Sequence, residues 1–135
     1  MPYDSILDIS ADILRRAATI ARTVAPPPLE IVRGGGAGPG VIYAANRNIV
    51  ADRSWDQSCD AADLPYLTIV DSTFGLAVAQ LLQTAADHER ADHAAALSVW
   101  PDNEHQRADF FAGREDPMAR NIARLILDSH TRMGR

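Results

Sequence analysis

The fold is decided by the longest amphipathic stretch of the chain, residues 71–100, which read DSTFGLAVAQLLQTAADHERADHAAALSVW. Asp71 and Ser72 are a helix start signal, and Pro101 cannot donate the amide hydrogen that would continue a helix past Trp100. Between these ends, apolar residues recur at helical spacing. They predict one buried face made of Phe74, Ala77, Val78, Leu81, Leu82 and Ala85.

A second amphipathic helix is expected at about residues 5–25. Ser5 and Asp8 have the spacing of a capping box, and three prolines at 26–28 end the helix because they lack amide hydrogens. The apolar residues of this stretch recur at steps of three and four. They predict a buried face of Ile6, Ile9, Ile13, Ala17, Ile20 and Val24.

Two further helices are expected in the C-terminal half of the chain. Asp60 can cap a short helix that runs to about Val70, and Asp116 with Pro117 marks the N-cap and first turn of a last helix. No element is predicted for residues 103–115. The last helix is expected to bury Met118, Ile122, Leu125 and Ile126.

Between the first and the central helix, residues 29–53 predict a small antiparallel β-meander. The residues from Asn46 to Asn48 suit a tight turn that tolerates positive φ. Three short apolar runs are typical of strands, 29–33, 41–45 and 49–53, and they predict a meander of two or three strands. Together the elements predict a single α+β domain that is mainly helical, with a helical region over about 60–130.

The segment between the first two strands is rich in glycine, with Gly34, Gly35, Gly36, Gly38 and Gly40. Gly35 and Gly40 have the spacing of a phosphate loop, but such a loop continues with a lysine and opens a helix. Here Val41 follows and opens a strand. We therefore interpret the segment as a flexible loop between strands.

The composition excludes several classes of function. The chain has 135 residues, of which 47% are apolar and 23% are charged, a balance typical of one globular domain. All 13 basic residues are arginine, which rules out a Schiff-base lysine. The single cysteine, Cys59, excludes a disulfide within the chain and a cysteine-rich zinc site.

The charge and the hydropathy pattern give an expected location. A net charge of −5 argues against a nonspecific binder of nucleic acid or of an anionic membrane. The N-terminal residues carry polar breaks where a secretory signal would be apolar, and no apolar run approaches the roughly 20 residues of a membrane span. The sequence therefore predicts a cytoplasmic protein, with neither a membrane nor a nucleic acid as its partner.

Two groups of side chains are candidates for contact with a partner. Residues 56–106 carry a net charge of −8, and the acids of the central helix form either a solvated face or a surface for a basic protein. Two adjacent phenylalanines cannot share one face of an element, so at least one covers a neighbouring element or contacts a partner. The predicted interaction residues are therefore Asp87, Glu89, Asp92, Phe110 and Phe111.

A metal site is the alternative use of the central helix. His88 and Asp92 stand at i and i+4, so they share one helix face. His93 lies five steps after His88 and not the four of the zinc-protease signature, so one face cannot present both rings to one ion. Such a site would need a distant ligand such as His105 or His130.

A phosphate contact is the alternative use of the last helix. Arg120 and Arg124 stand at i and i+4 on it and can contact phosphate groups. Interleaved acids leave residues 107–135 with a net charge of only +2, so this role is kept only as an alternative.

Four segments, in their order around a small hairpin, resemble small uncharacterised proteins of actinobacteria and their phages. The segments read DILRRAA at 12–18, DAADLPYLTIVD at 60–71, LAVAQLL at 76–82 and ARNIARLIL at 119–127. Those proteins often have Asp-Pro where this chain has Asp71-Ser72, and an aromatic-rich start of the strand where it has three prolines. The resemblance implies an accessory protein of phage or prophage type and carries no catalytic residue.

The sequence thus predicts a noncatalytic accessory protein that binds a macromolecule, with a protein as the preferred partner and a homo-oligomer as a further option. No complete catalytic constellation and no cofactor motif is visible, whereas the long amphipathic helix and the adjacent aromatics can supply an interface. The alternative is a small-molecule or metal-dependent enzyme that uses His88 and Asp92.

Overall fold

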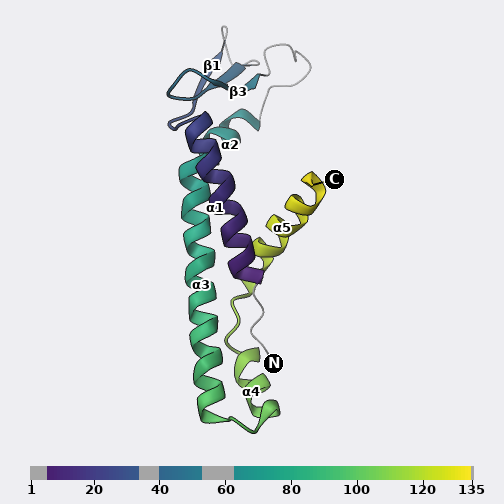
Figure 1. Ribbon diagram of the computed structural model, residues 1–135. Helices are drawn as coiled ribbons and strands as arrows, with labels where there is room; N and C mark the ends of the chain where they lie inside the picture. The colour runs from purple at the N-terminus through teal and green to yellow at the C-terminus, as the bar shows by residue number, and fades with distance from the viewer. Residues whose placement is uncertain (1–5, 34–39, 53–62, 135) are drawn as a thin grey trace. The chain divides into compact units, whose positions relative to one another are not determined.

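The computed structural model of this chain describes residues 6–33, 40–52 and 63–134 (Figure 1). Its elements are α1 Ile6–Val24, β1 Glu30–Arg33, β2 Gly40–Tyr43, β3 Ile49–Asp52, α2 Asp63–Ile69, α3 Ser72–Val99, α4 Glu104–Ala112 and α5 Pro117–Met133. The predicted α+β class is confirmed, because the chain is mainly helical with one small antiparallel sheet between the first and the later helices. No helix of these residues is both long and apolar enough to cross a membrane.

The chain divides into two compact units. The helical unit consists of Met1–Leu14 and Val78–Arg135, and the sheet unit consists of Arg15–Ala77. The boundaries between the units fall inside α1 and inside α3, so each of these helices has one part in each unit. This division does not test whether the chain forms a single domain, so the single domain stays a prediction.

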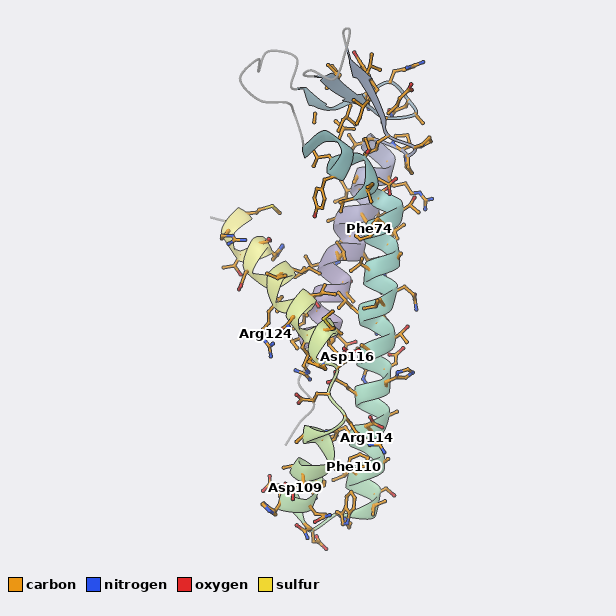
Figure 2. All side chains as sticks on the ribbon, turned by 180° about the vertical axis from the view of Figure 1, so that it is seen from behind. Phe74, Asp109, Phe110, Arg114, Asp116 and Arg124 are labelled. Atoms are coloured by element: carbon orange, nitrogen blue, oxygen red, sulfur yellow. The ribbon has the colours of Figure 1, made fainter. Side chains whose placement is uncertain are left out.

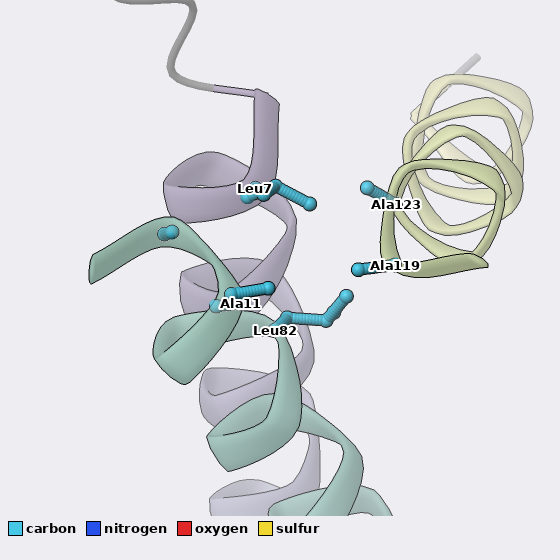
Figure 3. Close-up of a cluster of buried hydrophobic side chains, with 7 residues drawn as sticks. Leu7, Ala11, Leu82, Ala119 and Ala123 are labelled. Carbon is cyan, nitrogen blue, oxygen red and sulfur yellow. The ribbon is translucent and has the colours of Figure 1, made fainter. Parts of the chain in front are cut away.

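The core of the helical unit is built mainly from alanine. Leu7 of α1 and Leu82 of α3 are its two fully buried large side chains. Around them lies an alanine seam made of Ala11, Ala85, Ala86, Ala119 and Ala123 (Figure 3). Small side chains at a helix contact allow the axes to approach closely, so α1, α3 and α5 meet with little apolar volume between them.

The buried face of α3 differs from the predicted one. Leu82 is fully buried and Ala85 is nearly so, as expected, but Leu81 is 51% exposed. Phe74 and Ala77 are also exposed. Apolar residues occur on several sides of this helix, so periodicity alone does not choose the side that faces α1 and α5.

The predicted face of α1 is partly wrong. Ile6 packs against the core cluster of the helical unit, as expected. Ile9, Ile20 and Val24 are exposed. The buried residues of this helix are instead Leu7, Ser10, Ala11 and Ala18. Within the helical unit, Leu7 and Ala11 take the buried positions of α1 beside α3 and α5, and the small side chain of Ala11 allows the helices to approach closely.

The predicted face of α5 is partly wrong for the same reason. Ile122 and Ile126 pack against the alanine seam, as expected, but Met118 and Leu125 are exposed. Two alanines of α5, Ala119 and Ala123, take the buried positions.

The sheet unit contains a three-stranded antiparallel sheet in the order β1-β2-β3, with Ile31 paired to Ile42. Ile42 is fully buried, and Leu67 of α2 packs against it. The helix α2 lies next to the sheet (Figure 1). The predicted turn between β2 and β3 is confirmed, with Arg47 at a φ of 71°. Asn46 stabilises this turn, because its Oδ1 accepts a hydrogen bond from the Asn48 amide at 3.1 Å.

Several helix ends follow the predicted signals. Asp71 accepts a hydrogen bond from the Phe74 amide at 3.0 Å, and Asp116 accepts one from the Ala119 amide at 3.0 Å. Residues 103–115, for which no element was expected, contain α4, whose N-cap Asn103 accepts from the Gln106 amide. The predicted cap residues Ser5 and Asp60, and the glycine-rich loop from Gly34 up to Pro39, lie outside the described residues.

Candidate functional site

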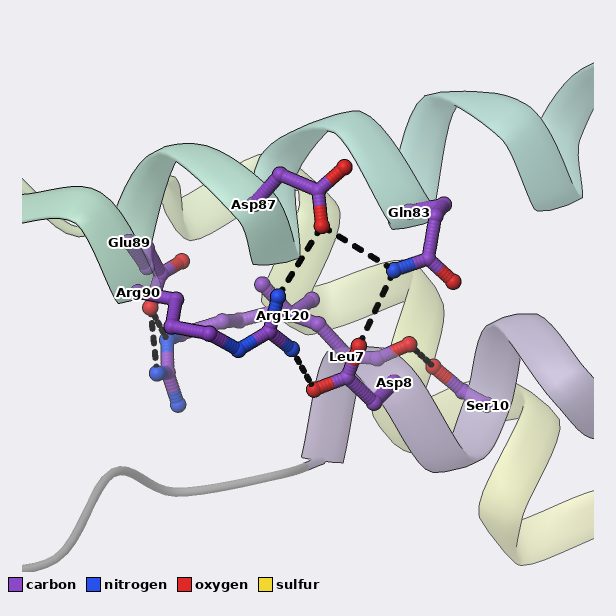
Figure 4. Close-up of polar contacts among 8 residues, drawn as sticks. All are labelled: Leu7, Asp8, Ser10, Gln83, Asp87, Glu89, Arg90 and Arg120. Carbon is purple, nitrogen blue, oxygen red and sulfur yellow. Dashed lines mark hydrogen bonds and ion pairs between the residues drawn. The ribbon is translucent and has the colours of Figure 1, made fainter.

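Glu89 lies inside the helical unit and not on a solvated face of α3. Its Oε1 accepts hydrogen bonds from Nε of Arg120 at 3.2 Å and from Nη2 of Arg120 at 2.5 Å (Figure 4). Glu89 is 5% exposed and Arg120 is 7% exposed. Glu89 is therefore no part of an exposed acidic surface, and Arg120 does not present its guanidinium group to phosphate at the surface.

Arg124, the second arginine of the predicted phosphate site, lies one turn further along α5. It is exposed and donates a hydrogen bond to Oδ1 of Asn121 at 3.3 Å (Figure 2). The structure therefore does not bring Arg120 and Arg124 together at one surface site.

A charged hollow of about 450 Å³ lies in the helical unit beside Glu89. It is lined by residues of α3 and of the segment that leads into α5: Ala85, His88, Glu89, Ala91, Asp92, Arg114 and Asp116. Oε2 of Glu89 is buried and has no hydrogen-bond partner within the described part of the chain. This oxygen has almost no accessible surface, so it lies beneath the lining of the hollow and not open to it.

The structure brings His88 and Asp92 to this same hollow, as their spacing predicts. Asp92 is already paired, because its Oδ1 lies 3.7 Å from Nη1 of Arg114. Across residues 6–33, 40–52 and 63–134, no three histidine, cysteine, aspartate or glutamate side chains are grouped so that they could hold a metal ion. The alternative metal site therefore lacks a third ligand in this part of the chain.

The two adjacent phenylalanines both contact neighbours within the helical unit. Phe110 tilts against Trp100 with a ring separation of 5.6 Å, and Phe111 stacks on His93 with a separation of 5.0 Å. The guanidinium group of Arg114 lies 4.5 Å from the centre of the Phe110 ring (Figure 2). Both rings are partly exposed, and a contact of either with a partner stays a prediction.

Asp87 takes part in a polar network between α1 and α3. It accepts a hydrogen bond from Nη1 of Arg90 at 3.0 Å and one from Gln83 at 3.2 Å (Figure 4). Arg90 also pairs with Asp8, which accepts a further hydrogen bond from Gln83 at 3.0 Å. The hydrogen bond from Arg90 lowers the pKa of the Asp8 carboxyl, against the smaller opposing effect of burial.

This network predicts how the stability of the helical unit changes with pH. Because the pKa of Asp8 is lower in the folded chain, its contribution is complete above the unfolded value of about 3.9 and is lost as the pH falls below it. Asp8→Asn is therefore expected to lower the free energy of unfolding at neutral pH by about 0.2–1 kcal/mol, since Arg90 is half exposed. Urea unfolding of wild type, Asp8→Asn and the exposed control Asp102→Asn at several pH values measures this. A difference between wild type and Asp8→Asn that persists at pH about 2 would contradict the assignment.

An apolar hollow of about 580 Å³ lies in the sheet unit. It is lined by Pro27, Pro28, Ile69, Asp71, Thr73, Phe74 and Ala77. Ile69 is 66% exposed and Phe74 is 45% exposed, so two large apolar side chains meet solvent beside one depression. This site could not be predicted from the sequence, because the three prolines indicate only the end of a helix and the helical spacing predicts that Phe74 is buried.

Large apolar side chains are also exposed elsewhere in both units. On the helices they include Ile9, Ile20, Val24, Tyr66, Leu81, Leu97, Val99, Met118, Leu125 and Met133, on the sheet Val32, Ile49 and Val50, and between α2 and α3 Val70.

This chain matches no protein-family model, no curated protein and no solved structure. The resemblance to proteins of actinobacteria and their phages therefore stays a prediction.

Proposed function

We propose that this protein acts by binding another protein and carries out no catalytic step. The observation that supports this most is the placement of apolar side chains: alanine fills much of the core of the helical unit, while Ile69 and Phe74 stand exposed beside the apolar hollow. Single exposed apolar side chains are ordinary in proteins. A group of them around one depression is typical of interaction sites.

The apolar hollow is shallow and open, so its lining favours a partner that lays an aliphatic or aromatic side chain against it. Pro27 and Pro28 have fixed φ angles and so offer a stiff wall, and Ala77 adds apolar surface. Burial of a side chain such as Ile69 or Phe74 contributes roughly 1.5–3 kcal/mol. These two residues are therefore expected to carry most of the binding free energy at this site.

The sequence resemblance supports an accessory role of phage or prophage type, in which the partner is a protein of the phage or of its bacterial host. The alternative, a small-molecule or metal-dependent enzyme that uses His88 and Asp92, is favoured by no further observation on the described residues. Stoichiometric metal in protein purified without a chelator would reopen that alternative.

A photo-reactive phenylalanine analogue at position 74 is expected to cross-link one defined protein in a lysate of the bacterial host. The partner is then purified and its Kd measured for wild type, Phe74→Ser and Leu125→Ser. Phe74→Ser is expected to raise the Kd at least about tenfold, the equivalent of 1.4 kcal/mol. Leu125→Ser, which removes an exposed leucine of α5 far along the sequence from the hollow, is expected to leave it unchanged.

Sedimentation of the purified protein at several concentrations tests a second copy as the partner. Self-association that Phe74→Ser abolishes would support binding through the apolar hollow, with the chain as its own partner. Equal effects of the two serine variants, or cross-links spread over many unrelated proteins, would overturn the proposal.

A further inference from the structure

The C-terminal end of α1 lacks the backbone donors that would continue the helix. In a continuing helix, the carbonyls of Arg22, Thr23 and Val24 accept hydrogen bonds from the amides four residues further along the chain. Those residues, 26–28, are all proline and have no amide hydrogen, so none of the three bonds can form. The last carbonyls of α1 therefore need donors from elsewhere.

The turn between β2 and β3 supplies such donors. The side-chain amides of Asn46 and Asn48 both donate to the carbonyl oxygen of Val24, that of Asn46 at 3.1 Å. The backbone amide of Ala45 donates to the carbonyl oxygen of Pro26 at 2.9 Å. Three hydrogen bonds, the turn–helix contact, thus join one turn to the point where α1 gives way to the prolines.

The turn itself keeps both asparagines in this arrangement. Oδ1 of Asn46 accepts a hydrogen bond from the Asn48 amide at 3.1 Å, and the Ala44 amide donates to the Asn48 carbonyl at 2.9 Å. Arg47 lies between the asparagines at a φ of 71°, which is uncommon for a residue other than glycine. Such a conformation costs free energy and persists where surrounding contacts fix it. The turn–helix contact is one of the contacts that fix it.

The prolines extend this arrangement to the apolar hollow. Pro27 and Pro28 line the hollow and directly follow Pro26, which accepts from the turn. Because the rings fix the φ angles of the prolines, few rotations are left to absorb a shift of Pro26 before it reaches the hollow. Neither asparagine lines the hollow itself. Any effect of the asparagines on the hollow therefore acts through residues 24–28.

We propose that Asn46 and Asn48 are positioning residues for the apolar hollow. By bonding the end of α1, they set the place of the proline wall against which a partner lays its side chain. The role of the wall in binding rests on the function proposed above, whereas its position does not. All of these residues belong to the sheet unit.

The test uses a double variant that loses both side-chain bonds to Val24 and keeps the turn. In Asn46→Asp/Asn48→Asp, the carboxylate at position 46 can still accept from the amide at position 48. At neutral pH, neither carboxylate can donate to the Val24 carbonyl. Arg47→Gly is the matched control in the same turn, because glycine adopts a positive φ readily and both asparagines stay.

The first measurement is the NMR spectrum of protein labelled with ¹³C at the methyl groups of isoleucine and alanine. The double variant is expected to shift the signals of Ile69 and Ala77, which line the hollow. The signals of Ile31 and Ile42, which pair within the sheet, are expected to stay in place. Loss of the whole hairpin would move the Ile42 signal as well, so the two pairs of signals separate positioning from unfolding. Arg47→Gly is expected to move none of the four.

The second measurement uses N-acetylleucinamide as a probe for the apolar side chain of a partner. Titration is followed through the Ile69 and Ala77 signals, and the double variant is expected to raise the Kd at least about threefold over wild type. Arg47→Gly is expected to bind the probe as wild type does. Wild type that does not bind the probe, while the double variant still shifts both signals, would support the positioning and count against the binding proposed above.

Two results would overturn the proposal. The first is a double variant whose Ile69 and Ala77 signals stay where they are in wild type, and the second is an equal shift of these signals in Arg47→Gly. If the Ile42 signal shows that the double variant has lost its hairpin, the single variant Asn48→Asp replaces it, because the bond from Asn46 to Val24 then remains. The same two outcomes decide for the single variant.

Discussion

Leu82→Asp is expected to unfold the helical unit, whereas Leu81→Asp leaves it folded. Leu82 is fully buried between α1, α3 and α5, so the change removes a core leucine and leaves a carboxylate without a partner. Loss of a buried leucine alone costs about 2–5 kcal/mol, and the buried charge adds to that. A typical small protein is stable by only about 5–15 kcal/mol in total. Circular dichroism and urea unfolding measure the outcome.

The neighbouring residue provides the matched control. Leu81 is 51% exposed, and exposed substitutions usually change stability by no more than about 0.5 kcal/mol. Periodicity predicts both leucines inside, so the pair separates the sequence pattern from the structure. If the two aspartate variants lose equal stability, the orientation assigned to α3 is wrong.

Arg120→Met is expected to lower the free energy of unfolding by about 3–5 kcal/mol. The substitution leaves Glu89 buried without the guanidinium group that donates to it, and Arg120 itself is enclosed, so neither solvent nor a surface cation can replace it. Glu89→Leu/Arg120→Met removes both charges and is expected to recover most of that loss, because apolar replacement of a whole buried pair is often neutral. Arg124→Met, one turn away and exposed, is the control.

Urea unfolding of the wild type, of the single variants Glu89→Leu and Arg120→Met, and of the double variant gives the coupling between Glu89 and Arg120. A coupling of several kcal/mol is expected for a pair that shares two hydrogen bonds inside the core. Single variants that each lose less than about 1 kcal/mol and add up in the double variant would show that the pair behaves as an exposed one.

The ends of the elements could be predicted from the sequence because local chemistry sets them. Asp71 and Asp116 cap their helices through bonds to amides three residues away, and Pro101 follows the end of α3. The turn at Arg47 lies between two short apolar runs and needs no distant contact. The helix α4 was missed because it buries no residue, so no apolar stripe marks it.

The buried side of each helix could not be predicted from the sequence, because contacts with other helices determine which side is buried. Isoleucines recur along α1 at helical spacing, but the buried contact is made by Leu7 and Ala11, and Ile6 is the isoleucine that packs beside them. The pairing of Glu89 with Arg120 joins residues 31 positions apart, and no spacing rule connects two different helices. His88 and Asp92 were placed together correctly because they lie one turn apart, whereas Arg114 and Asp116 reach the same hollow from another segment.

The alanine seam reverses the usual relation between the size of an apolar residue and its tolerance to mutation. At a fully buried alanine such as Ala86 or Ala123, even one added methylene overpacks the contact and costs typically about 1–3 kcal/mol. At an exposed Ile20 or Met133, a polar or smaller residue removes little packing. Neutral drift in this chain would therefore preserve its smallest side chains and vary its largest. A large apolar residue that resists drift at the surface would then mark a place where something other than folding constrains the chain.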